Sequence, residues 1–152
     1  MSIMQIGGKN DNLAIPVAVN SDGSVFTERE WIASPVNVLD GYALRDANTH
    51  YTMTEGTFVD LKPFGLVSLR IVNSTDKDIT FALLYDLNKN STTYLRDVDG
   101  NNIKIVAKSG KSMIITPNDM PVLNYIDYLK FNFSAAEAPT SGVITVIAYV
   151  KG

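Results

Sequence analysis

Residues 66–87 have the sequence LVSLRIVNSTDKDITFALLYDL, in which two apolar alternating runs flank a short polar segment. The polar segment, NSTDKD, has the size and chemistry of a loop between strands. In the second run every other residue is apolar, which gives a strand one apolar face along its whole length. These residues are Ile79, Phe81, Leu83, Tyr85 and Leu87. The pattern predicts two strands, the second of which is central to the core.

The same alternation recurs along the chain. It appears in NLAIPVAV at residues 12–19, in DYLKFNF at 127–133 and in VITVIAYV at 143–150. Turn signals separate the runs, such as SDGS at 21–24 and Asp-Gly at 99–100. With roughly eight to ten strands and almost no helix, the chain is predicted to be an all-β protein: an antiparallel β-sandwich, jelly-roll-like in form.

The start of the chain stands apart from the rest. Residues 1–34 are predicted to form an N-terminal arm with a β-hairpin, and residues 35–152 the β-sandwich domain. Pro16 removes a backbone hydrogen-bond donor from its strand, which places that strand at a sheet edge or in an arm. Residues 36–52 have the weakest periodicity, so the compact part is expected from about residue 50.

Two later segments depart from one-sided alternation. The stretch PNDMPVLNYID at 117–127 has room for a helical turn, because Pro117 and Pro121 bracket it. Leu129, Phe131 and Phe133 are expected to point inward. The last run, 143–150, is apolar on both faces, which predicts burial on both faces or cover by a partner.

Composition excludes several classes of protein. The 152 residues include no cysteine, which removes thiol catalysis, thiolate zinc sites and a disulfide framework. The formal net charge is −3, and the basic residues are scattered singly rather than gathered into a stripe that would bind nucleic acid. Neither a secretory signal nor a membrane span is expected from the sequence. No cofactor is expected either.

The sequence KSGKS at 108–112 has the Gly-Lys-Ser order of a phosphate-binding loop. Such a loop needs a further glycine five residues before Gly110, where this chain has Ile105. It also needs a following helix, whereas the run MIIT ends at Pro117. Because the flanking residues alternate around the glycine, a hairpin turn is predicted instead.

His50 is the only histidine in the chain. As a general base it would need a nucleophile and an orienting carboxylate, and no Gly-x-Ser-x-Gly elbow is present to expose a serine. A loop or strand-edge histidine without a catalytic role is the favoured interpretation. The chain is therefore expected not to be an enzyme, with a small hydrolase using His50 as the minor alternative.

Asp97, Asp99 and Asn101 occupy alternate positions in DVDGN, as at the start of a calcium loop. That loop requires a glycine at its sixth place and a glutamate at its twelfth, where this chain has Asn102 and Lys108. A hairpin turn is favoured, and a weak surface calcium site is the alternative.

Trp31, Tyr125 and Tyr128 offer a binding alternative, since aromatic planes stack on the apolar faces of sugar rings. Partial core burial of both tyrosines is the favoured interpretation, because they lie close to Leu129 and Phe131. Trp31 ends the N-terminal hairpin, where it suits a ligand or an anchor into a neighbouring subunit equally well.

The opening GGKNDNLAIPVAVNSDGSVF, at 7–26, is similar to a pattern common in virion proteins of tailed bacteriophages. There a glycine-rich lead precedes an apolar alternating strand, a Ser-Asp-Gly turn and a short return strand. The ending YLKFNFSAAEAPTSGVITVIAYVKG, at 128–152, resembles the closing hairpin of small β-sandwich phage structural proteins. Together the two stretches cover about a third of the chain.

The resemblance implies a non-enzymatic bacteriophage virion structural protein: a capsid decoration, head-fibre or tail accessory protein. It would be located in the virion, assemble in the host cytoplasm, and contact copies of itself and other virion proteins, without nucleic acid or membrane insertion. An arm strand added to a neighbour's sheet also favours a homo-oligomer on physical grounds. The expected contact residues are Leu13, Ile15, Val17, Phe26 and Trp31. A carbohydrate- or host-receptor-binding β-sandwich module is the alternative.

Overall fold

The computed structural model describes residues 19–20, 24–25, 34–84 and 90–152. The chain divides into two units, Met1–Ile32 and Ala33–Gly152, and each is described on its own. The contact residues expected in the N-terminal arm lie outside the described residues: Leu13, Ile15, Val17, Phe26 and Trp31.

The first unit contains a short antiparallel pair of strands. β2 (Val19–Asn20) pairs with β3 (Ser24–Val25), so that Val19 lies opposite Val25. This pairing confirms the β-hairpin predicted around the Ser-Asp-Gly turn.

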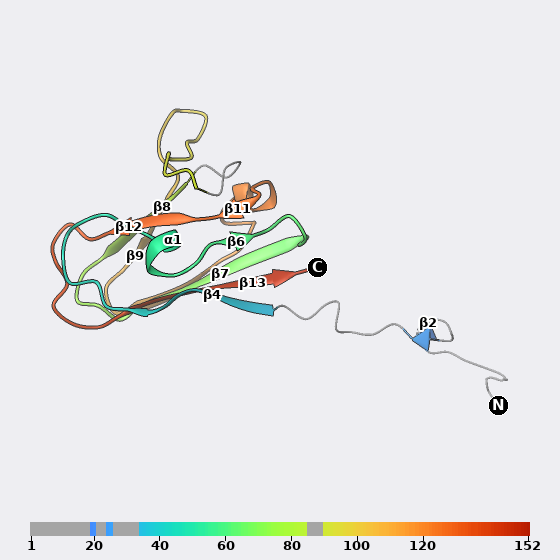
Figure 1. The fold of residues 1–152 in the computed structure, drawn as a ribbon, viewed down its shortest axis with the longest axis horizontal. Coiled ribbons are helices and arrows are strands. Elements are labelled where there is room, and N and C mark those ends of the chain that lie inside the picture. Colours follow the sequence, from blue (N-terminus) through green and yellow to red (C-terminus); the bar gives the residue numbers. More distant parts are fainter. Residues whose placement is uncertain (1–18, 21–23, 26–33, 85–89) are drawn as a thin grey trace. The chain divides into compact units, whose positions relative to one another are not determined.

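Two four-stranded antiparallel sheets form the two layers of the second unit (Figure 1). The first sheet has the order β10 (Lys111–Ile115), β7 (Leu66–Asn73), β13 (Ile144–Lys151) and β4 (Ser34–Tyr42). The second has the order β5 (His50–Tyr51), β12 (Phe131–Ser134), β8 (Ile79–Leu83) and β9 (Lys104–Ala107).

The strand order defines the fold. When these eight strands are numbered along the chain, the first sheet has the order 6-3-8-1 and the second 2-7-4-5. Among these eight strands, every consecutive pair except β8 and β9 therefore lies in opposite sheets. This alternation between the sheets is the arrangement of a jelly roll. The predicted antiparallel, jelly-roll-like sandwich is confirmed.

The core lies between the sheets and includes three fully buried phenylalanines. Phe81 on β8 meets Phe131 on β12 edge to face, with ring centres 5.9 Å apart, and Phe133 packs at 5.8 Å from the same ring. Such aromatic pairs stabilise a core beyond their buried area. The central position of the strand that begins at Ile79 is confirmed, as is the inward orientation of Leu129, Phe131 and Phe133.

The last strand, β13, is buried on one face only. Ile144, Val146, Ala148 and Val150 are buried, whereas the alternate residues are half-buried. Burial on both faces within the chain is therefore a wrong prediction, because β13 belongs to a two-layer sandwich and its second face lies on the outside of its sheet.

β4 lies in the segment of weakest periodicity, so the expectation that the compact part begins at about residue 50 is wrong. Two register shifts in its pairing with β13 insert extra residues into β4. As a result the adjacent residues Val38 and Leu39 are both fully buried, and Gly41 adopts a φ of 66°. Bulges therefore hide the strand from a period-two search.

Shorter elements complete the domain. β6 (Val59–Asp60) pairs with β11 (Tyr128–Leu129), and a 3-10 turn, η3 (Pro121–Asn124), confirms the predicted helical turn. One further turn of helix, α1 (Thr52–Glu55), has no sequence signal. It is held by Thr52, whose buried hydroxyl donates to the carbonyl of Phe131 at 3.2 Å and accepts from its N–H at 3.1 Å.

The polar segment NSTDKD is a corner that joins the two sheets. Asn73, at the end of β7, is fully buried, and its Nδ2 donates to the carbonyls of Lys77 and Ala107 at 2.8 and 2.9 Å. Its Oδ1 accepts from the N–H and the hydroxyl of Thr75 at 3.0 and 2.6 Å. Every bonding position of the amide is thus filled, as a buried polar group requires.

The same corner also holds the segment that leads into β13. Both oxygens of Asp76 accept bonds from Thr140, and these bonds, led by the Thr140 N–H, lower the pKa of Asp76 to about 2. Ser74 and Val143 exchange backbone and hydroxyl hydrogen bonds at 2.9–3.0 Å. Gly142 packs against this contact with a φ of 79°.

KSGK is a tight turn, as predicted, but it does not close a hairpin. The Lys111 N–H donates to the Lys108 carbonyl at 3.1 Å, and Gly110 has a φ of 71°. However, β9 pairs with β8 and β10 pairs with β7, so the turn passes from one sheet to the other. β12 and β13 likewise lie in different sheets and do not form a closing hairpin. Alternation identifies the buried face of a strand but not its neighbour.

Gly142 and Gly110 provide a matched test of the corner. Alanine at either position adopts a left-handed conformation that costs about 1–2 kcal/mol. At Gly142 the new Cβ would also lie 2.1 Å from the Ser74 carbonyl oxygen, whereas nothing lies within 4 Å at Gly110. We expect Gly142→Ala to destabilise the domain by about 2 kcal/mol more than Gly110→Ala in urea unfolding. Equal effects would contradict the close approach of the corner to Gly142.

Candidate functional site

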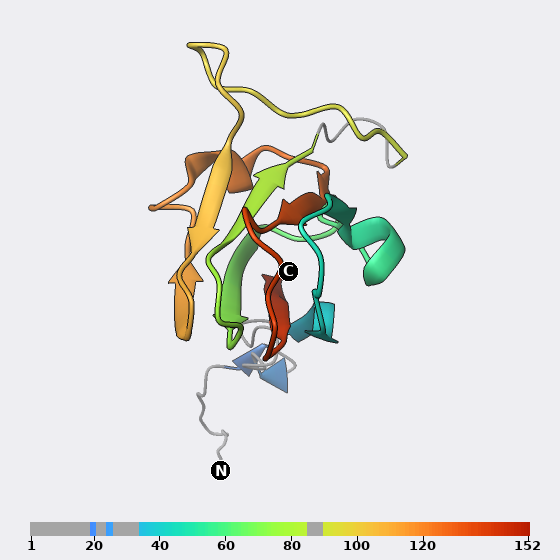
Figure 2. The same ribbon diagram turned by 90° about the vertical axis from the view of Figure 1, so that its left-hand side faces the viewer.

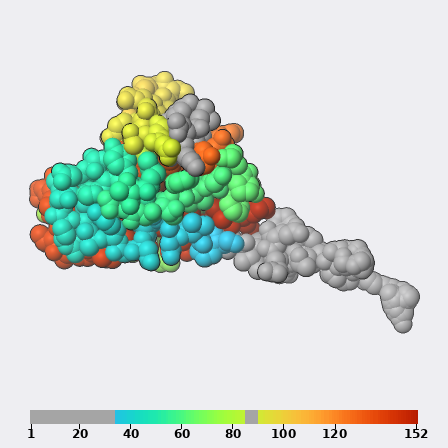
Figure 3. All heavy atoms as spheres, viewed as in Figure 1, coloured from blue at the N-terminus to red at the C-terminus, as the bar shows by residue number. Residues whose placement is uncertain are grey.

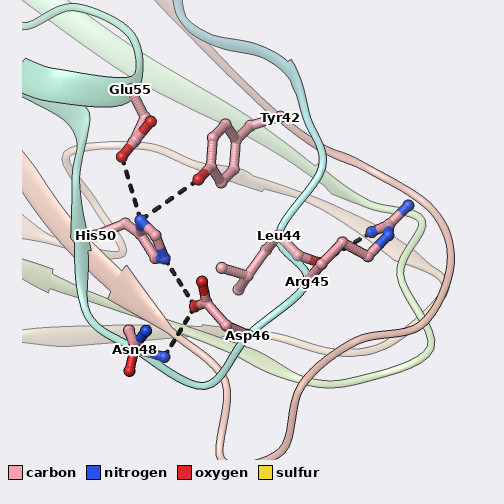
Figure 4. Close-up of polar contacts among 7 residues, drawn as sticks. All are labelled: Tyr42, Leu44, Arg45, Asp46, Asn48, His50 and Glu55. Atoms are coloured by element: carbon pink, nitrogen blue, oxygen red, sulfur yellow. Dashed lines mark hydrogen bonds and ion pairs between the residues drawn. The ribbon is translucent and has the colours of Figure 1, made fainter.

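A compact cluster of charged and polar side chains surrounds His50 (Figure 4). His50 lies on β5, Tyr42 ends β4, Asp46 lies in the loop between these strands, and Glu55 ends α1. Three elements that follow one another in the sequence therefore contribute side chains to one place at the rim of the sandwich.

Both ring nitrogens of His50 face carboxylates. Nε2 lies 2.8 Å from Asp46 Oδ1, and Nδ1 lies 3.2 Å from Glu55 Oε2. The Tyr42 hydroxyl is 3.4 Å from the same Nδ1. Since carboxylates only accept, this geometry favours a ring with a proton on each nitrogen, which is the positively charged imidazolium.

The electrostatics of the cluster follow from these contacts. The hydrogen bond to Asp46 raises the pKa of His50, and burial offsets part of that rise. The same bond is the main cause that lowers the pKa of Asp46. Burial, and then the negative charge of Glu55, raise the pKa of Tyr42.

The cluster packs on the edge of the core. The His50 ring stacks on Phe133 at a centroid distance of 5.9 Å and an interplanar angle of 27°. The Tyr42 ring meets Phe133 nearly at a right angle, 5.5 Å away. The cluster thus connects β4, β5 and α1 to a fully buried core residue.

This geometry differs from that of a hydrolase triad. A triad places a carboxylate on one ring nitrogen and a nucleophilic hydroxyl or thiol on the other. Here a carboxylate lies on each nitrogen, and the hydroxyl within reach is the phenol of Tyr42. The arrangement suits a stabilising ion cluster, and the absence of a catalytic role for His50 stays a prediction.

The partners of His50 were not identified from the sequence. Asp46 and Glu55 lie four and five residues from the histidine. This proximity in the sequence could have suggested them as partners of His50. Whether their side chains reach the ring depends on the path of the loop and of α1, which was not predicted.

Asp97, Asp99 and Asn101 lie in a surface turn (yellow in Figure 3), at whose tip Val98 is fully exposed. One oxygen of Asp97 accepts the backbone N–H groups of Asp99 and Asn101, both at 2.9 Å. The predicted turn is confirmed by the antiparallel bridge between Arg96 and Asn102. This carboxylate oxygen therefore stabilises the turn itself.

Two further searches concern only the part of the chain that the structure describes. No three His, Cys, Asp or Glu side chains are placed there to share a metal ion. No helix there combines the length and apolar character that a membrane crossing needs.

The two described tyrosines of the suggested sugar platform differ. Tyr125 follows η3 and is 79% exposed, so core burial is a wrong prediction for this residue. Tyr128 is half-buried, as predicted: Phe58 meets its ring edge-on, and Lys62 Nζ lies 3.9 Å from the ring centre. Trp31 lies outside the described residues. Of these two tyrosines, Tyr125 is therefore the one whose ring is exposed enough to stack on a ligand.

A polar hollow of about 170 Å³ lies beside Tyr125. Lys62, Asn124 and Asp127 are among its lining residues, as are the exposed Phe64 and Leu66. The hollow combines charged, amide and aromatic groups in one place.

Comparisons with known proteins give distant structural likenesses. No protein-family model and no curated protein sequence matches the chain. The fold is similar to the SPBc2 prophage-derived protein YomS, with 13% identity and a TM-score of 0.43, over 79% of this chain and 93% of that one. Two structures of the Tobacco streak virus coat protein share 13% identity at TM-scores of 0.31 and 0.32. They cover 78% and 84% of this chain, and 84% and 90% of their own.

The His50 cluster predicts a pH dependence of stability. Because the folded-state pKa of His50 is raised above 6.5, its contribution is fully present below pH 6.5 and is lost as pH rises through the raised value. We expect the free energies of unfolding of the wild type and of His50→Phe to differ most near pH 6 and to converge at higher pH.

The single histidine also gives one NMR titration, and Asp46→Asn should lower its midpoint. A wild-type midpoint below 6.5 would contradict this account.

Proposed function

We propose that this chain is a non-enzymatic virion structural protein of a bacteriophage, of the capsid decoration, head-fibre or tail accessory kind. In this proposal the jelly-roll unit is the body of the subunit. Residues 1–32 attach it to sister copies and to other proteins of the particle. Assembly takes place in the host cytoplasm, and the absence of cysteine suits a particle that forms under reducing conditions and is later exposed to oxygen.

The observation that carries the proposal is that the described core and the apolar run at 12–19 belong to different units of the chain. Both sheets and the described core, from Val38 to Val150, belong to the unit Ala33–Gly152. The apolar alternating run at 12–19 belongs to the other unit. A strand with one apolar face needs a surface that covers that face, and the sheet edge of a neighbouring subunit would provide one.

Three further features support the proposal. The jelly roll is an architecture that viral capsid proteins use, although lectins and cupins use it too, so the fold alone does not decide. The sequence at both ends resembles tailed-phage structural proteins. The cluster of titratable groups at His50 suits stabilisation better than catalysis.

A chain lacking residues 1–32 tests the proposal. Since the described core is contained in Ala33–Gly152, we expect the shortened chain to stay folded, with the circular dichroism of an all-β domain. It should have the mass of a monomer by light scattering at concentrations where the full chain self-associates. It should also fail to join particles. A shortened chain that keeps the native mass of the full protein and still joins particles would refute the proposal.

The exposed Tyr125 favours a second candidate, a carbohydrate- or host-receptor-binding module. A sugar ring could stack on this tyrosine while Lys62, Asn124 and Asp127 bond its hydroxyls at the neighbouring hollow. Titration calorimetry with cell-wall polysaccharides tests this candidate, with Tyr125→Ala as the matched variant. Binding that is absent, or unaffected by the substitution, would remove it.

A further inference from the structure

The edges of the two four-stranded sheets differ in their capacity to accept another strand. β4 contains Pro35, the left-handed Gly41 and two bulges, which interrupt its row of backbone hydrogen-bonding groups. β5 is two residues long. On β9, the carbonyl of Ala107 already accepts a bond from Asn73. β10 is the longest regular edge, and it contains neither proline nor glycine.

The side of the domain formed by β9 and β10 also exposes apolar side chains (Figure 2). Ile114 on β10 is 68% exposed, and Val106 on β9 is 44% exposed. Next to β10 is a mainly apolar hollow of about 280 Å³. It is lined by Val106, Ala107, Lys108, Lys111, Ser112 and Met113. Exposed apolar edges of this kind are sites for pairing with another chain.

Residues 13–19, LAIPVAV, have the pattern that this edge needs. Large apolar side chains occupy the odd positions, and Ala14, Pro16 and Ala18 occupy the even ones. In a strand, successive side chains point to opposite faces and successive N–H groups to opposite edges. The direction of the added strand therefore decides which edge the N–H groups of the odd residues face when their side chains face the hollow. In one of the two directions, these N–H groups point toward β10. Pro16, which has no N–H, would then face solvent without loss of a bond.

We propose that β10 accepts residues 13–19 of a second copy of this chain as a new edge strand. This inference rests on the proposed function, and it names the surface that receives the N-terminal segment. Because the added strand carries Pro16 on its outer edge, a further strand from another copy cannot pair regularly along it. Each copy supplies one donor segment and one acceptor edge, so association closes as a reciprocal dimer or a ring.

Charge favours this occupant over a second β10 edge. Residues 1–32 contain two basic and four acidic side chains, a net charge of −2. The basic ones are Lys9 and Arg29, and the acidic ones are Asp11, Asp22, Glu28 and Glu30. The acceptor side carries Lys104, Lys108 and Lys111, of which Lys108 pairs with Asp78 at 3.2 Å. Opposite charges steer the donor to this side, whereas two basic edges would repel each other.

A complementation experiment tests the inference in the full-length chain. The donor variant is Ile15→Glu with Val17→Glu, and the acceptor variant is Lys111→Glu with Met113→Glu. By light scattering over a concentration series, we expect the unaltered chain to self-associate and each variant alone to be monomeric. An equimolar mixture of the two variants should give a complex of two chains, because it restores one intact donor and one intact edge.

Two further variants keep the test decisive. Ser34→Glu with Asn37→Glu places the same charges on the β4 edge, and it should associate like the unaltered chain. If circular dichroism shows that the acceptor variant is unfolded, Lys104→Glu with Lys111→Glu replaces it, since both lysines are exposed. That replacement should weaken self-association about tenfold and reduce its dependence on salt.

The outcomes separate this inference from the proposed function. If the donor variant is monomeric but the acceptor variants associate normally, the N-terminal segment still mediates assembly and β10 is the wrong acceptor. If the donor variant associates normally while the acceptor variants do not, β10 edges pair with each other and the inference fails. If both kinds of variant associate normally, or if the unaltered chain is monomeric at every concentration, arm-mediated self-association fails as well.

Discussion

The side-chain amide of Asn73 joins the two layers of the jelly roll. It ends β7 in one sheet and bonds to the carbonyl of Ala107 at the end of β9 in the other. The corner that it organises also binds the β9–β10 turn, where Ser109 N–H donates to Asp78 and Ser109 Oγ donates to the Thr75 carbonyl. Through Asp76 and Ser74 the same corner holds the approach to β13. The corner as a whole thus fixes several crossings between the sheets, and at its centre the hydrogen bonds of the buried Asn73 amide would be costly to leave unmade.

This corner has a consequence for the outer surface of the domain. By fixing the β9–β10 turn, it places β9 and β10 in different sheets, and each strand then has one edge without a strand partner. At the other end of the first sheet, bulges and Pro35 interrupt β4. The first sheet therefore presents one regular edge, β10, and one irregular edge, β4. A one-sided apolar segment at residues 13–19 matches the first, and its own proline would stop growth beyond a closed assembly.

Most of the fold could be predicted from the sequence because its strands alternate. Ile79, Phe81 and Phe131 are buried as the period-two pattern predicts, and η3 lies between the expected prolines. The failures have specific causes. Bulges disguised β4, and alternation could not show that the strands around Gly110 pair with different neighbours. Lys130 is fully buried where alternation indicates an exposed side chain, and its Nζ donates to the Ser91 carbonyl at 3.1 Å. The His50 cluster required the three-dimensional path of a loop and of α1, which local sequence does not encode.

The most direct measurement is hydrogen–deuterium exchange of the β10 amides, residues Lys111–Ile115, in the full chain and in the chain that lacks residues 1–32. An edge strand with solvent-facing N–H groups exchanges quickly unless another strand covers them. The account predicts slow exchange at β10 in the assembled full chain, faster exchange in the shortened chain, and no difference at β4. Equal exchange at β10 in both chains, at a concentration where the full chain is assembled, would contradict it.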